Sequence, residues 1–394
     1  MILGVPRESY PGERRVAIVP AATPALVKAG FEVLVEAGAG LEAGYPDRDY
    51  TEKGAKLTAD RAEIFRTADI VAQVLCFGSN DMTGKADLPL MRSGQAIVGF
   101  LRPMGKLEDL QALAGTGVTS FAVELMPRTT RAQSMDALSS MATICGYKAV
   151  VMAADTLPRI FPMLTTAAGT ITPGRVFIIG TGVAGLQAIA TARRLGAVAS
   201  AYDMRPAVKE QVQSLGGRFV ELPIEAKDAQ DTRGYATAQG EEFYRKQREL
   251  LGGAVAESDV VITAAVIPGK KSPVLVTKEM VERMAPGSVI VDLAAERGGN
   301  CELTQAGKIV KERGVTIIGQ FNLASAVPYH ASQMYAKNLS AFLLNLVKDG
   351  KLQINEKDEI HRETLLTRGG EIVNARVREF LGLNSLAASE VKQS

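Results

Sequence analysis

A glycine-rich turn between two apolar runs constrains the fold of this chain more than any other feature. Residues 176–179 form a short apolar run, which is typical of a buried parallel strand. The turn that follows has G-x-G-x-x-G spacing and comprises Gly180, Gly182 and Gly185. A helical pattern begins at once, and a second apolar run, 198–202, ends on Asp203. This order of strand, glycine turn, helix, strand and acid predicts a dinucleotide-binding unit.

Each residue of the turn has a physical reason in such a unit. Gly180 allows the tight turn out of the strand, Gly182 lets a pyrophosphate approach the backbone, and Gly185 lets the helix pack against the sheet. The first helical residues, Val183 and Ala184, direct backbone N–H groups and the positive end of the helix dipole toward the phosphates. A glycine turn without any ligand is the alternative interpretation.

The acid at the end of the second run bears on the choice of dinucleotide. The carboxylate of Asp203 can accept hydrogen bonds from both ribose hydroxyls of NAD and would repel the 2′-phosphate of NADP. Met204 and Arg205 follow it, and an arginine near this point can accommodate a 2′-phosphate. We favour NAD because Asp203 holds the position at the end of the strand.

The composition excludes several classes of protein. A length of 394 residues predicts two domains, and a net charge of +2 gives no reason to expect a nucleic-acid partner. The three cysteines are scattered and show neither metal-ligand spacing nor a disulfide framework. The N-terminus lacks the features of a signal peptide, and no apolar run reaches about 18 residues. We therefore expect a cytoplasmic protein without a membrane span or a metal site.

Strands and helices alternate along the chain, which predicts an α/β fold with two Rossmann-like lobes and parallel sheets. Long helical patterns from Ser134 toward Pro158 and over 331–348 are expected to link the lobes, with a cleft between them. The first lobe would combine residues 1–137 with 330–394, and residues 138–329 would form the NAD lobe. Loops are expected at 38–44, where PDRD interrupts a helix, at 163–173, and at 225–240.

Three further segments carry side chains suited to chemistry. Residues 128–140, RTTRAQSMDALSS, concentrate hydrogen-bonding groups, although a helix start with Thr130 or Ser134 as its N-cap explains them as well. A tyrosine in the loop at Gly234 and Tyr235 could close over a cofactor or be merely exposed. Val266 and Ile267 follow an expected strand and could line an adenine pocket or belong to an ordinary turn.

Several of these motifs together resemble one known family. They are GTGVAGLQAIATARRLGA, YDMRP, RTTRAQSMDALSS, MLTTAAGTITP, AAVIPGK and GSVIVDLAAERGGNC. The chain resembles the NAD(H)-binding component, domain I, of proton-translocating NAD(P) transhydrogenases almost from end to end. The RAQSMDALSS element is the most specific part of the match. Alanine dehydrogenases are relatives with the same two-lobed fold.

The two families differ at two positions that an amino-acid dehydrogenase needs. Alanine dehydrogenases carry a catalytic lysine where this chain has Gln73, and a catalytic histidine near Phe100, Leu101 and Arg102, where this chain has none. Arg15, which in those relatives meets the substrate carboxylate, is retained and would then be inherited structure.

The resemblance implies direct hydride transfer between NADH on this chain and NADP⁺ on a partner subunit, with no protein acid or base. Its nicotinamide-positioning residues would be Arg128, Gln133, Asp136 and Ser139. Tyr235 would fold over the nucleotide, and Gly234, Gln247 and Val266 would add contacts. The expected partners are an NADP(H)-binding subunit, a membrane-spanning proton-channel subunit that holds this chain at the inner membrane, and a second copy in a homodimer. An alanine or other amino-acid dehydrogenase and a non-catalytic NAD-binding regulator are the alternatives.

Overall fold

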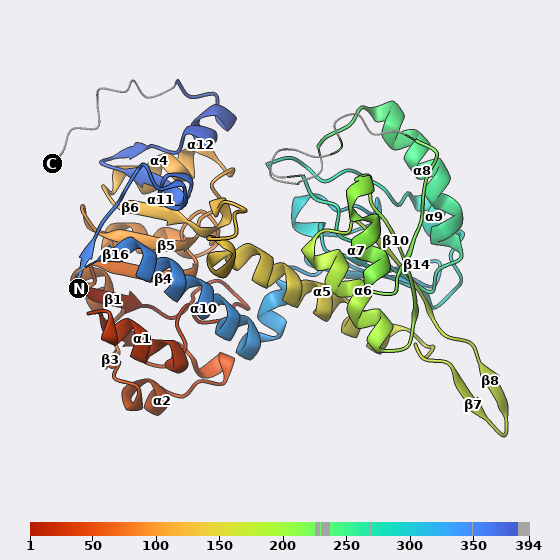
Figure 1. The fold of residues 1–394 in the computed structure, drawn as a ribbon, viewed down its shortest axis with the longest axis horizontal. Coiled ribbons are helices and arrows are strands. Elements are labelled where there is room, and N and C mark those ends of the chain that lie inside the picture. The colour runs from red at the N-terminus through yellow and green to blue at the C-terminus, as the bar shows by residue number, and fades with distance from the viewer. Residues whose placement is uncertain (225–228, 230–236, 268, 349, 385–394) are drawn as a thin grey trace. The chain divides into compact units, whose positions relative to one another are not determined.

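The computed structural model describes residues 1–224, 229, 237–267, 269–348 and 350–384 and divides into two compact units. Unit 1 comprises Met1–Met141 and Ser325–Ser394, and unit 2 comprises Ala142–Ala324 (Figure 1). Helix α5 (Ala137–Thr156) begins in unit 1 and ends in unit 2. Helix α10 (Pro328–Leu346) lies wholly in unit 1. The second of the two expected linking helices is therefore part of one unit, because the chain returns to unit 1 before α10 begins.

Unit 1 contains a mixed sheet in the order β19-β18-β6-β5-β4-β1-β2-β3. Its strands are β1 (Ile2–Val5), β2 (Glu32–Glu36), β3 (Lys56–Thr58), β4 (Ile70–Leu75), β5 (Ala96–Phe100), β6 (Thr119–Ala122), β18 (Leu365–Arg368) and β19 (Glu371–Ile372). The first six are parallel, and all of them except β3 were expected from the alternating pattern. Strands β18 and β19 extend the sheet antiparallel. The sequence pattern did not indicate these last two strands.

Helices cover the sheet of unit 1. They are α1 (Thr23–Lys28), α2 (Asp47–Glu52), α3 (Arg61–Thr67), α4 (Leu107–Gly115), α11 (Glu359–Thr364) and α12 (Ala375–Phe380), together with α10. Helices α3 and α4 share one apolar cluster with β4 and β5. On α10, the rings of Tyr335 and Phe342 are fully buried and pack against Phe100 and Phe121. A short hairpin, β16 (Val347–Lys348) and β17 (Lys351–Leu352), follows α10. The PDRD segment, 46–49, was expected to interrupt a helix, but its residues from Asp47 onward begin α2.

Unit 2 contains the sheet β11-β10-β9-β12-β13-β15-β14, in which only β14 is antiparallel among the strands described. The strands are β9 (Arg175–Ile179), β10 (Val198–Tyr202), β11 (Arg218–Phe219), β12 (Val260–Thr263), β13 (Val289–Asp292), β14 (Ile309–Glu312) and β15 (Val315–Ile318). The helices are α6 (Val183–Arg194), α7 (Lys209–Ser214), α8 (Glu241–Ala256) and α9 (Lys278–Glu282).

The central strand β9 shows why this sheet is covered on both faces. Its side chains alternate between the two faces, as a strand requires. Val176 and Ile178 belong to an apolar cluster with residues of α5 and α6, whereas Phe177 and Ile179 belong to a second cluster with residues of α8. The glycine turn after β9 is therefore held on a strand that is buried on both sides.

Residues 163–173, expected as a polar loop, contain a β-hairpin. Strands β7 (Leu164–Thr166) and β8 (Gly169–Ile171) pair antiparallel, and all six of their residues are exposed. The hairpin extends away from the rest of unit 2 (Figure 1).

Helix α5 is the one described helix with the length and mean hydropathy, 1.3, to cross a membrane. This differs from the expectation that every apolar run is too short. A core helix of a globular protein has the same composition, and Ala149, Val150 and Ala153 of α5 pack in the core of unit 2.

Candidate functional site

Two glycines of the turn after β9 are required by packing. Gly180 has φ +94°, and a Cβ built on it would lie 2.8 Å from the backbone of Ala264 and Ala265, which follow β12. A Cβ on Gly185 would lie 2.0 Å from the carbonyl oxygen of Gly180, so only glycine lets α6 come this close to the turn. Both positions would need glycine whether or not a ligand binds.

Gly182 differs from its two neighbours. Its φ of −71° is open to any residue, and a Cβ built on it meets no protein atom within 4 Å. It occupies the N-cap of α6, where no side chain caps the backbone N–H groups of the first helical turn. Neither strain nor packing accounts for glycine here, whereas the close approach of an anion to these N–H groups does.

The carboxylate of Asp203 follows β10 and is buried beside this turn. Its Oδ2 accepts hydrogen bonds from the backbone N and the hydroxyl of Thr181, at 2.8 and 3.1 Å. Arg205 forms an ion pair with the same carboxylate: its Nε lies 2.8 Å from Oδ1, its Nη2 2.7 Å from Oδ2, and its backbone N 2.9 Å from Oδ1. Asp203 thus ties the turn after β9 to the end of β10.

These partners determine the charge of Asp203. Burial alone would raise the pKa of Asp203, but the hydrogen bonds and charge of Arg205, together with the backbone N–H groups of Arg205 and Thr181, hold it below its ordinary value. The carboxylate is therefore ionised at neutral pH, and the adjacent guanidinium balances its charge.

Further predicted contacts lie around the same strand ends. Gln247 of α8 is buried and donates from Nε2 to the hydroxyl of Tyr202, 2.9 Å away, directly before Asp203. Its Oε1 has no hydrogen-bond partner among the residues described. Burial raises the pKa of Tyr202 to about 12, so its hydroxyl stays protonated. Val266 is exposed in the loop whose Ala265 lies against Gly180. Gly234 and Tyr235 lie outside the described residues.

The segment predicted to position a nicotinamide lies in unit 1 and forms a capped helix start. Gln133 is exposed in a 3-10 turn, Gln133–Met135, and Arg128 is exposed before it. Asp136 caps α5: its Oδ1 accepts from the backbone N of Ser139 at 2.9 Å and its Oδ2 from the Ser139 hydroxyl at 2.5 Å. The cap is Asp136 rather than an earlier serine or threonine. Capping accounts for the contacts of Asp136 and Ser139, but it does not account for the exposed Arg128 and Gln133.

The carboxyl edge of the unit 1 sheet is occupied by buried ionisable side chains. Arg15 donates to both carboxylate oxygens of Glu13, from Nε at 2.7 Å and Nη2 at 2.6 Å, and both side chains are buried. Glu8 accepts from the backbone N of Val74 and Leu75, at 2.6 and 3.0 Å. Burial raises the pKa of Glu8 to about 8, and the charge of Glu13 adds to this effect.

The two positions that separate this chain from amino-acid dehydrogenases also lie in unit 1. Gln73 is 1% exposed, donates to Asp87, and has no partner for its Oε1 among the residues described. Arg102 has φ +51° and pairs with Asp81. Both ring nitrogens of His361 are engaged, by Asn355 and Asn345, and His330 is exposed at the start of α10.

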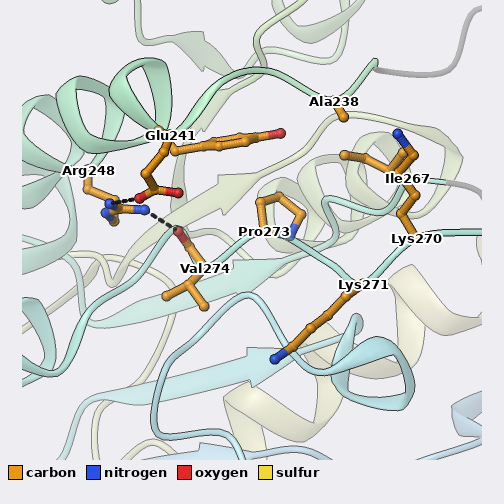
Figure 2. Close-up of a pocket in the computed structure, with 9 residues that line it drawn as sticks. Ala238, Glu241, Arg248, Ile267, Lys270, Lys271, Pro273 and Val274 are labelled. Carbon is orange, nitrogen blue, oxygen red and sulfur yellow. Dashed lines mark hydrogen bonds and ion pairs between the residues drawn. The ribbon is translucent and has the colours of Figure 1, made fainter.

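A pocket of about 340 Å³ lies in unit 2 between the start of α8 and the loop after β12. Figure 2 shows Glu241 paired with Arg248, which also reaches the carbonyl oxygen of Val274. The side chains of Lys270 and Lys271 point in different directions in the same view. Ile267, which was expected with Val266 to line an adenine pocket, is one of the residues that line it. Gly180, Gly182, Gly185 and Asp203 do not line it, so the pocket does not include the glycine turn that the motif predicts to hold the phosphates.

Comparison with known proteins identifies relatives over nearly the whole chain. Residues 4–145 match the model "Alanine dehydrogenase/PNT, N-terminal domain", and residues 149–375 match "Alanine dehydrogenase/PNT, C-terminal domain". The chain is 47% identical over 380 residues to the first part of NAD(P) transhydrogenase subunit alpha from Rhodospirillum rubrum. The alignment covers 95% of this chain and 98% of that protein. It is 29% identical over 405 residues to alanine dehydrogenase of Bacillus subtilis, covering 100% and 98%. The crystal structure of a transhydrogenase from Sinorhizobium meliloti matches with a TM-score of 0.82 and 43% identity, covering 95% of this chain and all of that one.

Proposed function

The chain belongs to the alanine dehydrogenase/PNT family, and we propose that it is the NAD(H)-binding subunit of a proton-translocating transhydrogenase. Its identity to a transhydrogenase subunit, 47%, exceeds its identity to an alanine dehydrogenase, 29%. The geometry of the turn after β9 in unit 2 supports a dinucleotide site independently of these sequence identities.

The observation that carries the proposal is Gly182. Gly180 and Gly185 are explained by backbone packing, but Gly182 has unstrained backbone and no neighbour that a Cβ would touch. A diphosphate at the uncapped start of α6 supplies the missing reason for glycine. Asp203 stands at the end of the next strand, where an adenosine ribose would present its hydroxyls.

The chain's own residues would bind and orient rather than exchange protons. A dihydronicotinamide supplies a hydride when NADH is bound. The N–H groups at the start of α6 would hold the phosphates, and Asp203, Met204, Arg205, Gln247 and Val266 would surround the adenosine half. Arg128, Gln133, Asp136 and Ser139 would orient the nicotinamide, and Gly234 and Tyr235 would cover the nucleotide. NADP⁺ on a partner subunit would accept the hydride.

The structure of unit 1 supports this function over that of an amino-acid dehydrogenase. The imine chemistry of such an enzyme needs an acid–base group beside the substrate. Gln73 cannot ionise, and His361 is engaged by Asn345 and Asn355. Arg15 is held by Glu13, so its charge is already balanced.

Partner subunits are part of the proposal. A chain similar to one portion of a transhydrogenase alpha subunit would need an NADP(H)-binding subunit, and a membrane-spanning proton-channel subunit would keep it at the inner membrane on the cytoplasmic side. A second copy is supported by the β7–β8 hairpin, where Met163, Leu164 and Ile171 are 63%, 45% and 51% exposed. An apolar pocket of about 380 Å³, formed in part by Leu157, Ile160, Phe161 and Leu195, adjoins its base. A protruding apolar element and an apolar hollow on one unit suit a two-fold dimer.

The first experiment tests the phosphate site through Gly182→Ala. Because the Cβ meets nothing, the variant should unfold at the same temperature as the wild type but bind NADH at least tenfold more weakly. Gly253→Ala on α8, where a Cβ also meets nothing, is the matched control and should bind NADH normally. Unchanged NADH binding by Gly182→Ala, measured by calorimetry, would refute the phosphate site.

The second experiment tests the reaction. The protein mixed with an NADP(H)-binding transhydrogenase subunit, NADH and an NADP analogue should transfer hydride. Pyruvate, ammonia and NADH should give no turnover. Turnover with pyruvate instead of hydride transfer would make the chain an amino-acid dehydrogenase, and NADH binding without either reaction would favour a non-catalytic NAD-binding regulator.

A further inference from the structure

We propose that Arg205 is an internal competitor for the ribose site at Asp203, and that its displacement sets both the affinity for NADH and the discrimination against NADPH. The inference rests on the proposed function, since it assumes that a dinucleotide binds at the turn after β9. It assigns a separate role to one residue, and that role is tested independently below.

The hydrogen bonds of Asp203 show why a ribose cannot simply be added. A carboxylate offers about four lone-pair sites. Asp203 already accepts five hydrogen bonds: two from Thr181, one from the backbone of Arg205, and two from the Arg205 side chain. The buried carboxylate has no capacity left for the two hydroxyls of a ribose.

Three of these five bonds belong to the fold. The backbone N and hydroxyl of Thr181 and the backbone N of Arg205 come from the turn and the strand end, and their loss would open the site itself. The other two bonds are donated by the Arg205 side chain, which can rotate away from Asp203. They reach one oxygen each, Nε to Oδ1 and Nη2 to Oδ2. A ribose diol would use one hydroxyl for each oxygen in the same way, so the guanidinium takes the place that the diol needs.

The exchange has a consequence for affinity. Only molecules in which the Arg205 side chain has left Asp203 can accept the ribose through both oxygens. The apparent affinity for NADH is therefore lower than the intrinsic one by the fraction of molecules in that state. Removal of the paired hydrogen bonds from Nε and Nη2 of Arg205, the fork, should therefore tighten NADH binding.

The same pair has the opposite consequence for NADPH. A 2′-phosphate beside an unpaired Asp203 would meet an unbalanced negative charge. With Arg205 in place the carboxylate is neutralised, and the guanidinium itself can pair with a phosphate. Loss of the guanidinium should therefore weaken NADPH binding while it strengthens NADH binding, so the ratio of the two affinities is the diagnostic quantity.

The experiment measures NADH and NADPH dissociation constants by calorimetry for the wild type, Arg205→Met and Arg205→Lys. Arg205→Met removes charge and fork together, and NADH should bind about tenfold tighter while NADPH binds about tenfold weaker. Arg205→Lys keeps the charge but cannot form a fork. It should tighten NADH without weakening NADPH. Lys209→Ala removes an exposed cation four residues along and should match the wild type.

The outcomes separate this inference from the proposed function. Wild-type protein that binds neither nucleotide would refute both. If the wild type binds NADH but Arg205→Met and Arg205→Lys bind it no tighter, only the competitor role is refuted. An ion pair that merely stabilises the fold would lower the unfolding temperature and weaken both nucleotides equally. The competitor role instead predicts a lower unfolding temperature without ligand and a larger increase on adding NADH.

Discussion

The two sheets of this molecule share a topology but differ at the edge where ligands bind. In unit 1 the parallel strands run β3-β2-β1-β4-β5-β6, and in unit 2 they run β11-β10-β9-β12-β13-β15. In both, the strand order reverses beside the first strand, which is where a doubly wound sheet opens a crevice. One topology therefore offers the same opening twice.

The residues after the first strand decide what the opening becomes. After β9 the chain turns through glycines and leaves backbone N–H groups uncapped at the start of α6. After β1 it continues through Glu8, Glu13 and Arg15, whose ionisable side chains are buried. After its first strand, unit 2 thus presents backbone N–H groups, whereas unit 1 has buried ionisable side chains. Topology places a potential site, and local sequence keeps it or closes it.

The largest expected effect tests the buried Glu13–Arg15 pair of unit 1. In Glu13→Gln, Arg15 keeps its charge in a buried position without its carboxylate partner, and unit 1 should lose about 3–5 kcal/mol of stability. Hydrogen exchange should confine the loss to amides of unit 1. The double variant Glu13→Gln with Arg15→Met should recover much of it. A loss below about 1 kcal/mol would mean that the pair does not fill the edge.

The next effect tests the glycine turn after β9 in unit 2. Gly185→Ala places a Cβ 2.0 Å from the carbonyl oxygen of Gly180, and unit 2 should lose about 3 kcal/mol as α6 moves away from β9. Gly182→Ala, three residues earlier, should cost almost nothing. Thermal unfolding of the two variants without nucleotide checks the contrast. Equal losses would contradict the division between packing and ligand glycines.

A smaller effect concerns pH. Because burial raises the pKa of Glu8 to about 8, the folded protein keeps a proton that the unfolded chain releases near 4.5. The contribution of protonated Glu8 to stability is complete below pH 4.5 and is lost as the pH rises through about 8. The loss should be roughly 2 kcal/mol, less than the full shift implies, because a buried site relaxes on ionising. In Glu8→Gln, urea unfolding followed by the exchange of unit 1 amides should lack this slope. An identical slope would assign it to another group.

The smallest expected effect tests the start of α5. Asp136→Ala removes the cap on the Ser139 N–H and should cost about 1 kcal/mol, whereas Asp136→Asn keeps a capping oxygen and should cost less. If Asp136 also orients a nicotinamide, both variants should slow hydride transfer more than they weaken NADH binding. Normal transfer by Asp136→Asn would leave capping as its whole role.

The sequence predicted the parts of the fold that depend on backbone pattern. The strand, glycine turn and helix at 175–194 stand where the motif predicted them, because only glycine fits at Gly180 and Gly185. Strand β15 was expected at 315–318, but its partner β14 and the β18–β19 pair were missed. Arg313 and Gly314 have φ of +46° and +85°, and Gly369 and Gly370 have +59° and +86°. A Gly-Gly pair such as Gly369–Gly370 favours a tight hairpin turn, whereas arginine at a positive φ does not.

The side-chain contacts were not predictable in the same way. Asp203 and Arg205 are two residues apart, and the sequence suggested separate roles for them at the ribose. Their fork depends on the χ angles of Arg205 and on the burial of both groups beside Thr181, neither of which a linear pattern contains. The Glu13–Arg15 pair escaped prediction for the same reason.

The discontinuity of unit 1 has a consequence for its biosynthesis. The ribosome completes Ala142–Ala324, all of unit 2, before Ser325 and the residues that follow complete unit 1. At about 5–20 residues per second, the segment from Ser325 to Ser394 takes several seconds more to emerge. During that interval β6 is an unpaired edge, since its neighbour β18 has not been made, and the place of Tyr335 and Phe342 in the core is empty. The region of the protein translated first is therefore the last to fold, and it is the region that a chaperone would need to protect.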